Sequence, residues 1–211
     1  MQYEQSENTQ ENNRVFLMGK VLTEPVPSHE IFGEEQYEFT LAISRLSNIT
    51  DNIPITVSAE QIKSNTITPG SLIAIRGQFR SYNKIVGDRS KLMLTVFAQE
   101  FVPTENVENS NLIELTGYLC KAPIYRTTPF NREIADILVA VNREYNKSDY
   151  IPAIAWGKYA RAAKNMLVGD KINISGRIQS REYQKRFPDG TSETRVAYEI
   201  SINNLSQSDQ V

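Results

Sequence analysis

Cysteine, histidine and tryptophan are nearly absent from this chain, with one residue of each among 211. A single cysteine, Cys120, cannot form a disulfide within the chain, and we expect it to be a small core residue. The one histidine, His29, lies in the turn-like stretch PVPSHEIFG. Any Ser-His-Asp or Cys-His centre, or any zinc site with histidine, would have to use it. We therefore predict no enzyme activity, no metal site and no cofactor.

Motifs that mark other classes of protein are missing as well. The sequence contains no G-x-x-x-x-G-K-[ST], no G-x-G-x-x-G and no C-x-x-C. No stretch approaches the roughly 20 apolar residues that a membrane span needs. The first residues, MQYEQSENTQENN, are polar and acidic and lack the basic-then-apolar order of a signal peptide. These absences predict a cytoplasmic protein without membrane contact.

The charge is unevenly distributed. The net charge is −2, but residues 14–103 carry nine basic and nine acidic side chains, whereas residues 111–205 carry fourteen and ten. The excess of positive charge is thus confined to the second half. Such a local excess is expected where a surface meets phosphate groups.

The two halves of the chain repeat one another. Gly19 and Pro25 recur as Gly117 and Pro123, and EFTLAISR recurs as DILVAVNR at the same spacing. Matches at a constant offset indicate a duplication. We therefore predict two domains, 14–103 and 111–205, joined by a linker at 104–110 and flanked by a disordered tail at 1–13 and a short tail at 206–211.

Each half has the pattern of a small β-barrel. Alternating or apolar stretches such as IELTGYL, ADILVAVN and KINISGRI are typical of strands. Residues 158–168 predict a helix with Ala162, Ala163, Met166 and Leu167 on its buried side. The weaker segment SAEQIKSNTITPG is its counterpart in the first half. Five strands with one helix between the third and fourth indicate an all-β protein with two tandem five-stranded OB folds.

Aromatic and basic residues are interleaved in the second half, as a surface for single-stranded nucleic acid requires. They cluster at predicted strand ends and on the hairpin REYQKRFPDGTSETRVAY. We assign Tyr118 and Tyr198 to the core. The candidate binding residues are Tyr145, Tyr150, Trp156, Tyr183, Arg126, Arg143, Lys158, Arg177, Arg181, Lys185, Arg186 and Phe187.

The second half resembles the bacterial single-stranded-DNA-binding protein family. The resemblance rests on NLIELTGYLCKAPIYRTTP, LVAVNREY, YIPAIAWGK, NMLVGDKINISGRIQSREY and YEISINNL. It implies base stacking on Tyr145, Tyr150, Trp156 and Tyr183, and it implies that two-domain chains pair as homodimers with four OB domains. The matching cations are Arg126, Lys158 and Arg181.

Two features depart from that family. The first half has Ser47, Asn52, Ser58 and Lys84 at the aromatic positions, so we expect it mainly to build the assembly, with a subsidiary DNA contact through Arg76, Arg80, Tyr82 and Lys84. The chain ends in SQSDQV without the family's acidic, apolar tip. We therefore do not expect recruitment of repair proteins by that route.

The leading hypothesis is single-stranded DNA binding without sequence preference, in replication, recombination or repair. An alternative is an adaptor or assembly protein of a primosome-like, conjugation or phage replication complex. RNA binding is a third possibility, because stacking alone does not distinguish RNA from DNA.

Overall fold

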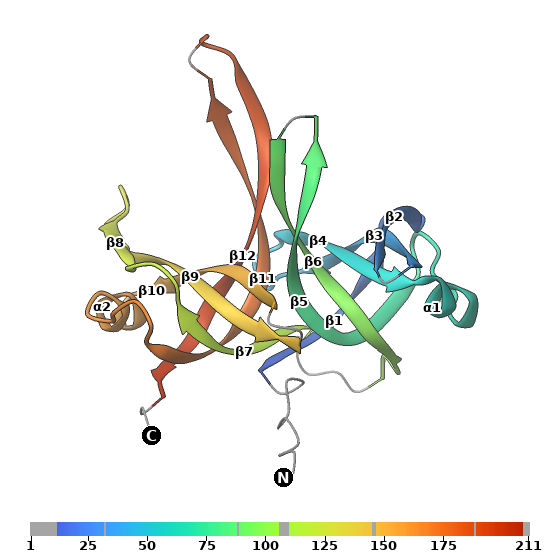
Figure 1. Ribbon diagram of the computed structural model, residues 1–211, viewed down its shortest axis with the longest axis horizontal. Coiled ribbons are helices and arrows are strands. Elements are labelled where there is room, and N and C mark those ends of the chain that lie inside the picture. Colours follow the sequence, from blue (N-terminus) through green and yellow to red (C-terminus); the bar gives the residue numbers. More distant parts are fainter. Residues whose placement is uncertain are drawn as a thin grey trace, which may run out of the picture.

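Two β-barrels of the same design follow one another along the chain (Figure 1). The computed structural model describes residues 12–208 apart from 32, 88, 106–109, 145–146 and 188. The N-terminal barrel contains β1 (Asn13–Val21), β2 (Val26–Ile31), β3 (Glu34–Ser44), β4 (Thr50–Ser58), α1 (Ala59–Ser64), β5 (Leu72–Val86) and β6 (Arg89–Val102). The C-terminal barrel contains β7 (Asn111–Leu119), β8 (Ile124–Thr127), β9 (Glu133–Arg143), β10 (Lys147–Trp156), α2 (Lys158–Ala163), β11 (Lys171–Arg186) and β12 (Ser192–Gln207).

Each barrel closes in the same way. In the N-terminal barrel β1 pairs with both β5 and β3, and β4 pairs in parallel with β6. In the C-terminal barrel β7 pairs with both β11 and β9, and β10 pairs in parallel with β12. The β5–β6 and β11–β12 hairpins extend from the barrels on the same side of the molecule (Figure 1). The predicted pair of tandem OB folds is therefore confirmed.

Strand pairing between β1 and β7 joins the barrels into one continuous sheet. Val15 lies opposite Ile113 at the centre of this antiparallel pair, with Asn13 opposite Leu115 on one side and Leu17 opposite Asn111 on the other. Asn111 and Leu115 are the counterparts of Asn13 and Leu17, 98 positions later, and Asn13 and Leu17 each pair with the counterpart of the other. The two repeats of the sequence are therefore related by an approximate twofold axis within one chain.

Alternation of side chains creates the core. In β10, Asp149, Ile151, Ala153 and Ala155 are buried, and Trp156 at the end of the strand is exposed. A period of two places successive side chains on opposite faces of a sheet, so each strand supplies one row to the barrel interior. The buried rows are mostly Ile, Val, Leu and Ala. The apolar side of each strand therefore faces inward.

Both long hairpins contain a bulge at a glycine. The register shifts between Arg76 and Gly77 in β5, and between Ser175 and Gly176 in β11. A Cβ atom at Gly176 would lie 2.2 Å from the carbonyl oxygen of Ser201. The strands approach so closely at this point that only glycine fits without a shift.

Hydrogen bonds to buried aspartates also link the barrels. The Asp149 carboxylate of β10, which is fully buried, accepts bonds from the backbone N–H of Ser81 (2.7 Å) and from its hydroxyl (3.2 Å) in β5. Asp51 accepts the N–H of Ser180 (2.8 Å) at the equivalent place on the other side of the axis. Each barrel therefore inserts a carboxylate beneath the long hairpin of the other.

Several details differ from the sequence predictions. Each barrel has a sixth short strand, β2 or β8, that pairs with the edge of β3 or β9, and His29 lies in β2 rather than in a turn. The helix α2 ends at Ala163, after which Met166 N–H bonds back three residues to Ala163. Ala162, within the helix, is exposed, and so is Leu167 in the turn that follows. The buried helix residues are Ala160 and Ala163.

The domain boundaries and the burial of two tyrosines agree only in part with the predictions. The first strand begins at Asn13, one residue before the predicted domain, and β12 continues to Gln207, two residues beyond it. Tyr198 packs against the core as predicted. Tyr118 does not, because 40% of it is exposed.

Candidate nucleic-acid interface

One face of the C-terminal barrel carries the predicted aromatic residues of β10. We call this the outer face, meaning the side of β11, β12, β10, β9 and β8 that points away from the barrel core. Tyr150 is 46% exposed and Trp156 is 36% exposed, and the even-numbered positions of β10 share this side. The indole Nε1–H of Trp156 donates to the Ser201 hydroxyl of β12 (3.2 Å). Trp156 therefore points outward rather than into the core.

The strand β11 continues the same face. Arg177 pairs with Ser201 in register, and Tyr183, 39% exposed, pairs with Arg195. Residues directly opposite one another in a sheet share a face. The β11 and β12 side chains on the outer face are therefore Arg177, Gln179, Arg181, Tyr183, Arg195, Glu199 and Ser201.

Two cations on this face are held by carboxylates. Arg126 of β8 bonds to Asp136 of β9 (2.9 and 3.3 Å), and Arg181 lies 3.5 Å from Glu199. About half of each arginine side chain is exposed to solvent (51% and 55%). Exposed ion pairs contribute only about 0–1 kcal/mol. The Arg126 guanidinium can therefore exchange Asp136 for a phosphate at little cost. Glu199 is buried, but it also accepts a hydrogen bond from Gln179 (2.8 Å), so it keeps a partner if Arg181 turns to a phosphate.

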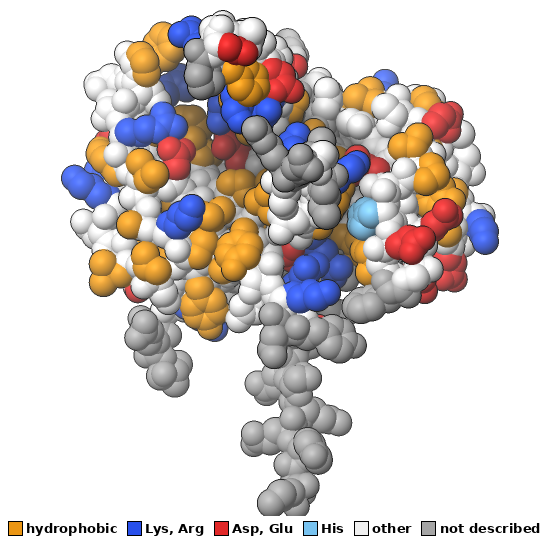
Figure 2. Space-filling view, turned by 45° about the horizontal axis from the view of Figure 1, so that its top comes forward, with side chains coloured by type: hydrophobic (Ala, Val, Ile, Leu, Met, Phe, Trp, Pro, Cys, Tyr) orange, Lys and Arg blue, Asp and Glu red, His pale blue; other side chains and the backbone are white. Residues whose placement is uncertain are grey.

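The hairpin of β11 and β12 adds charge beyond the barrel. The Arg181 guanidinium lies 5.9 Å from the Tyr183 ring, and Lys185 Nζ lies 5.4 Å from the Phe187 ring. Arg186 is exposed on the opposite side of β11. In Figure 2 the C-terminal barrel, on the left, presents hydrophobic side chains with Lys and Arg side chains among them.

Of the remaining predicted residues, Arg177 lies on the outer face, whereas Arg143 and Lys158 do not. Arg143 has the inward orientation of its strand and lies in the groove between the barrels, 3.3 Å from Asp149. Arg177 is half-buried, and its pKa is lowered by burial and by the like charge of Arg45. Lys158 begins α2, with Nζ 4.7 Å from the Tyr159 ring. Tyr145 lies outside the described residues.

The sequence analysis missed two residues of this face. Tyr118 of β7 pairs with Ala140 of β9, which in turn pairs with Tyr150 of β10, so Tyr118 extends the aromatic row. The alternation in IELTGYL, with Leu119 buried, was the signal that could have placed Tyr118 outside. Arg195 lies over the Phe187 ring at 5.9 Å, and it was overlooked because it is on the returning strand of the hairpin.

The corresponding face of the N-terminal barrel has different chemistry. Arg80 lies over the ring of Phe97 (4.6 Å), and Tyr82 stacks on His29 with 4.5 Å between ring centroids. Arg76 is bound to Glu100 (3.3 Å) outside this group.

The described residues also bear on metal binding, membrane insertion and thiol reactivity. Within the described ranges, no group of three or more His, Cys, Asp or Glu side chains is placed to hold a metal ion. The same part of the chain contains no helix that is long and apolar enough to cross a membrane. The Cys120 thiol donates to the carbonyl of Leu138 (3.2 Å), and burial raises its pKa. A raised pKa makes a thiol a poor nucleophile at neutral pH.

Comparisons with known proteins agree with this architecture. Residues 110–207 match the model of the single-strand binding protein family. The "Single-stranded DNA-binding protein" of Clostridium tetani is 39% identical over 88 residues, which cover 38% of this chain and 59% of that protein. "Single-stranded DNA-binding protein 1" of Lactococcus lactis is 30% identical over 110 residues, which cover 47% of this chain and 73% of that protein.

A solved structure extends the similarity over both barrels. The wild-type single-stranded DNA binding protein from Thermus aquaticus has the same fold, with a TM-score of 0.74, 20% identity and 94% of each chain covered. By contrast, the chain spans about 59–60% of the length of the first curated relatives that it matches. The family match and the Lactococcus relative together place this chain in the single-strand binding protein family.

Proposed function

We propose that this protein binds single-stranded DNA without sequence preference, on the outer face of the C-terminal barrel, and that it catalyses no reaction. The observation that carries this proposal is the exposure of Tyr150, Trp156 and Tyr183 on one continuous face, with arginines between them. An isolated exposed ring has many explanations. Three rings from two strands on one face, interleaved with cations, are what a single strand requires.

Stacking supplies the first part of the affinity. Every base has a flat π-face, so a ring can accept any base, and each stacked base contributes about 1–3 kcal/mol. Tyr118 lies in the same row and offers a further ring.

Phosphate contacts supply the second part. We propose that Arg126 and Arg181 release their carboxylates and bind phosphates, and that Lys158 and the hairpin cations Lys185 and Arg186 meet the strand beyond the barrel face. The ring of Phe187, between Lys185 and Arg195, would stack with a base at the tip. A strand covered in this way is protected during replication, recombination or repair.

We also propose that two chains associate as a homodimer in the cytoplasm, which would assemble four barrels. Large apolar side chains remain exposed on the N-terminal barrel, among them Leu22, Val26 and Leu72. An exposed apolar surface of this kind often marks an interaction site. Sedimentation should give a mass twice that of one chain, and a monomer at micromolar concentration would contradict this part.

Titration with oligo(dT) tests the binding. The wild type should bind, and its affinity should fall steeply between about 50 and about 200 mM salt, because bound cations displace counterions from the strand. A triple variant, Tyr150→Ala with Trp156→Ala and Tyr183→Ala, should bind at least about 100-fold more weakly if each ring contributes at least about 1 kcal/mol.

A matched control uses Leu167→Ala, which removes an exposed apolar side chain away from the outer face. It should bind as the wild type does. Binding that is insensitive to salt, or a triple variant with unchanged affinity, would overturn the proposal. Competition between matched DNA and RNA strands would show which polymer is preferred.

A further inference from the structure

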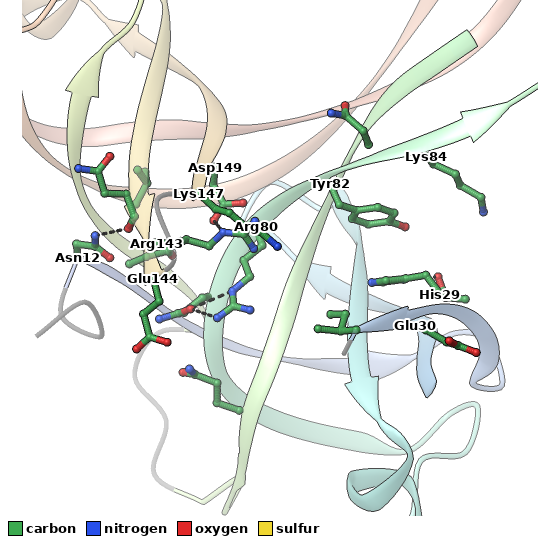
Figure 3. Close-up of a pocket in the computed structure, with 18 residues that line it drawn as sticks. Asn12, His29, Glu30, Arg80, Tyr82, Lys84, Arg143, Glu144, Lys147 and Asp149 are labelled. Carbon is green, nitrogen blue, oxygen red and sulfur yellow. Dashed lines mark hydrogen bonds and ion pairs between the residues drawn. The ribbon is translucent and has the colours of Figure 1, made fainter. Parts of the chain in front are cut away.

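A groove of about 900 Å³ separates the two barrels, outside the outer face described above (Figure 3). One wall is formed by β5 and β2 of the N-terminal barrel, with Arg80, Tyr82 and His29. The other wall is the end of β9 and the start of β10, with Arg143 and Lys147. The groove therefore combines rings from one barrel with cations from both.

Neither arginine of this groove has hydrogen-bond geometry to the buried carboxylate of Asp149. Asp149 lies beside both, but one of its oxygens is occupied by the N–H and hydroxyl of Ser81. Its other oxygen is 3.3 Å from Arg143 Nε, within ion-pair distance but without hydrogen-bond geometry. Arg80 donates both of its bonds to the neutral amide oxygen of Gln78 (3.0 and 2.6 Å).

The equivalent site across the twofold axis is different. There Arg45 makes a bidentate pair with Asp51 (2.7 and 2.5 Å), which satisfies both groups. In the groove, burial and the like charge of Arg143 lower the pKa of Arg80, although Asp149 and Glu144 oppose this effect. An added anion between Arg80 and Arg143 would relieve the repulsion between them. Arginine is well suited to binding phosphate at such a place.

The ring pair lies on the same wall of the groove as Arg80. The rings of His29 and Tyr82 are stacked with an interplanar angle of 22°, and both are partly exposed. Burial lowers the pKa of His29, with Lys84 acting in the same direction and Glu38 opposing it, so the imidazole is neutral at pH 7. A neutral stacked pair is a platform for a base, and the exposed Lys84 two residues further along β5 supplies a cation.

The groove and the outer face are physically connected. The backbone N–H of Tyr150 donates to the hydroxyl of Ser81 (2.9 Å), which is the residue directly before Tyr82. The strands that carry Tyr150 and Tyr82 therefore touch at Ser81, whose side chain lies on the opposite side of β5 from that of Tyr82. We propose that the groove continues the DNA path, with a phosphate between Arg80 and Arg143 and a base stacked against Tyr82 and His29. This inference rests on the proposed function.

The test compares oligonucleotide lengths in the full chain. An oligo(dT) of about eight nucleotides can occupy the outer face alone, whereas one of about thirty can also enter the groove. A double variant, His29→Leu with Tyr82→Leu, removes both rings and keeps apolar bulk. It should bind the long strand about 5- to 150-fold more weakly, which corresponds to the loss of one stacked base, and bind the short strand as the wild type does.

A second variant and a control test whether misfolding explains a loss of binding. Lys84→Glu changes an exposed residue of the groove and should also weaken binding of the long strand only. Lys63→Gln removes an exposed cation of the same barrel that lies outside the groove and should change neither affinity. If both groove variants bind the long strand within twofold of the wild type, the inference is overturned. If the wild type binds neither length, the proposed function fails with it.

A crosslinking readout does not depend on these variants. A long oligonucleotide carrying photoreactive 5-iodouracil should form an adduct with Tyr82 or His29, in addition to adducts on the outer face. Adducts confined to Tyr150, Trp156 and Tyr183 would restrict the path to the C-terminal barrel. That result would leave the proposed function intact and refute the inference.

Discussion

The one tryptophan of this chain permits a direct test of the stacking interface. Trp156→Ala removes the indole from the outer face, and the loss of one stacked base should weaken oligo(dT) binding by about 1–3 kcal/mol, or about 5- to 150-fold in Kd. The change also removes the 3.2 Å bond to Ser201, at a cost of about 1 kcal/mol to folding. That cost is small against the roughly 5–15 kcal/mol of a typical domain, so the variant should remain folded.

Fluorescence makes the assay specific to this ring. Because the chain has a single tryptophan, its emission reports the surroundings of Trp156 alone. Emission should be quenched on addition of oligo(dT) and should saturate at the stoichiometry of binding. Trp156→Phe keeps a ring and should lose less affinity than Trp156→Ala. Unchanged emission at saturating DNA, or an alanine variant that binds within twofold of the wild type, would refute a stacking role for this residue.

Three further predictions concern charge, burial and close packing. Arg181→Gln should reduce the slope of log K against log salt by about 0.7, which is the contribution of one phosphate contact to a single strand, and an unchanged slope in titrations would show that Arg181 makes none. Burial raises the pKa of Asp149, so its contribution to stability is complete below the unfolded pKa of about 3.9 and is lost as the pH rises through the higher folded pKa. Urea unfolding should therefore show the wild type losing stability relative to Asp149→Asn as the pH rises above about 3.9, whereas a constant difference would contradict the raised pKa. Gly176→Ala should lower the free energy of unfolding by about 1–3 kcal/mol, since its Cβ would lie 2.2 Å from a carbonyl oxygen, and a wild-type melting temperature would show that the bulge can relax.

Much of the candidate site could be predicted from the sequence because its signals are local. Alternation along β10 places Trp156 on the opposite side of the strand from Ala155, and the turn signals in REYQKRFPDGTSETRVAY mark a long hairpin. The helix α2 was predicted too long because Ala, Lys and Leu continue beyond Ala163, although the chain turns there. Helix propensity is a weak guide when tertiary contacts determine where a helix ends.

Such local signals could not predict how the two barrels are arranged. Arg143 is a basic residue at the end of a strand, as expected of a binding residue, yet it faces a carboxylate buried under the other barrel. The pairing of His29 with Tyr82 joins residues more than fifty positions apart, and nothing local in the sequence predicts that they meet. Register and strand order decide these contacts.

The sequence by itself determined the duplication, the two OB folds and the ring-bearing strands, because strand periodicity and turn chemistry act between near neighbours. The tertiary structure alone decided that β1 and β7 pair, that a groove opens between the barrels, and that its two arginines lie beside a carboxylate already bonded to Ser81. Those features arise from contacts between distant segments, which depend on the packing of the whole chain.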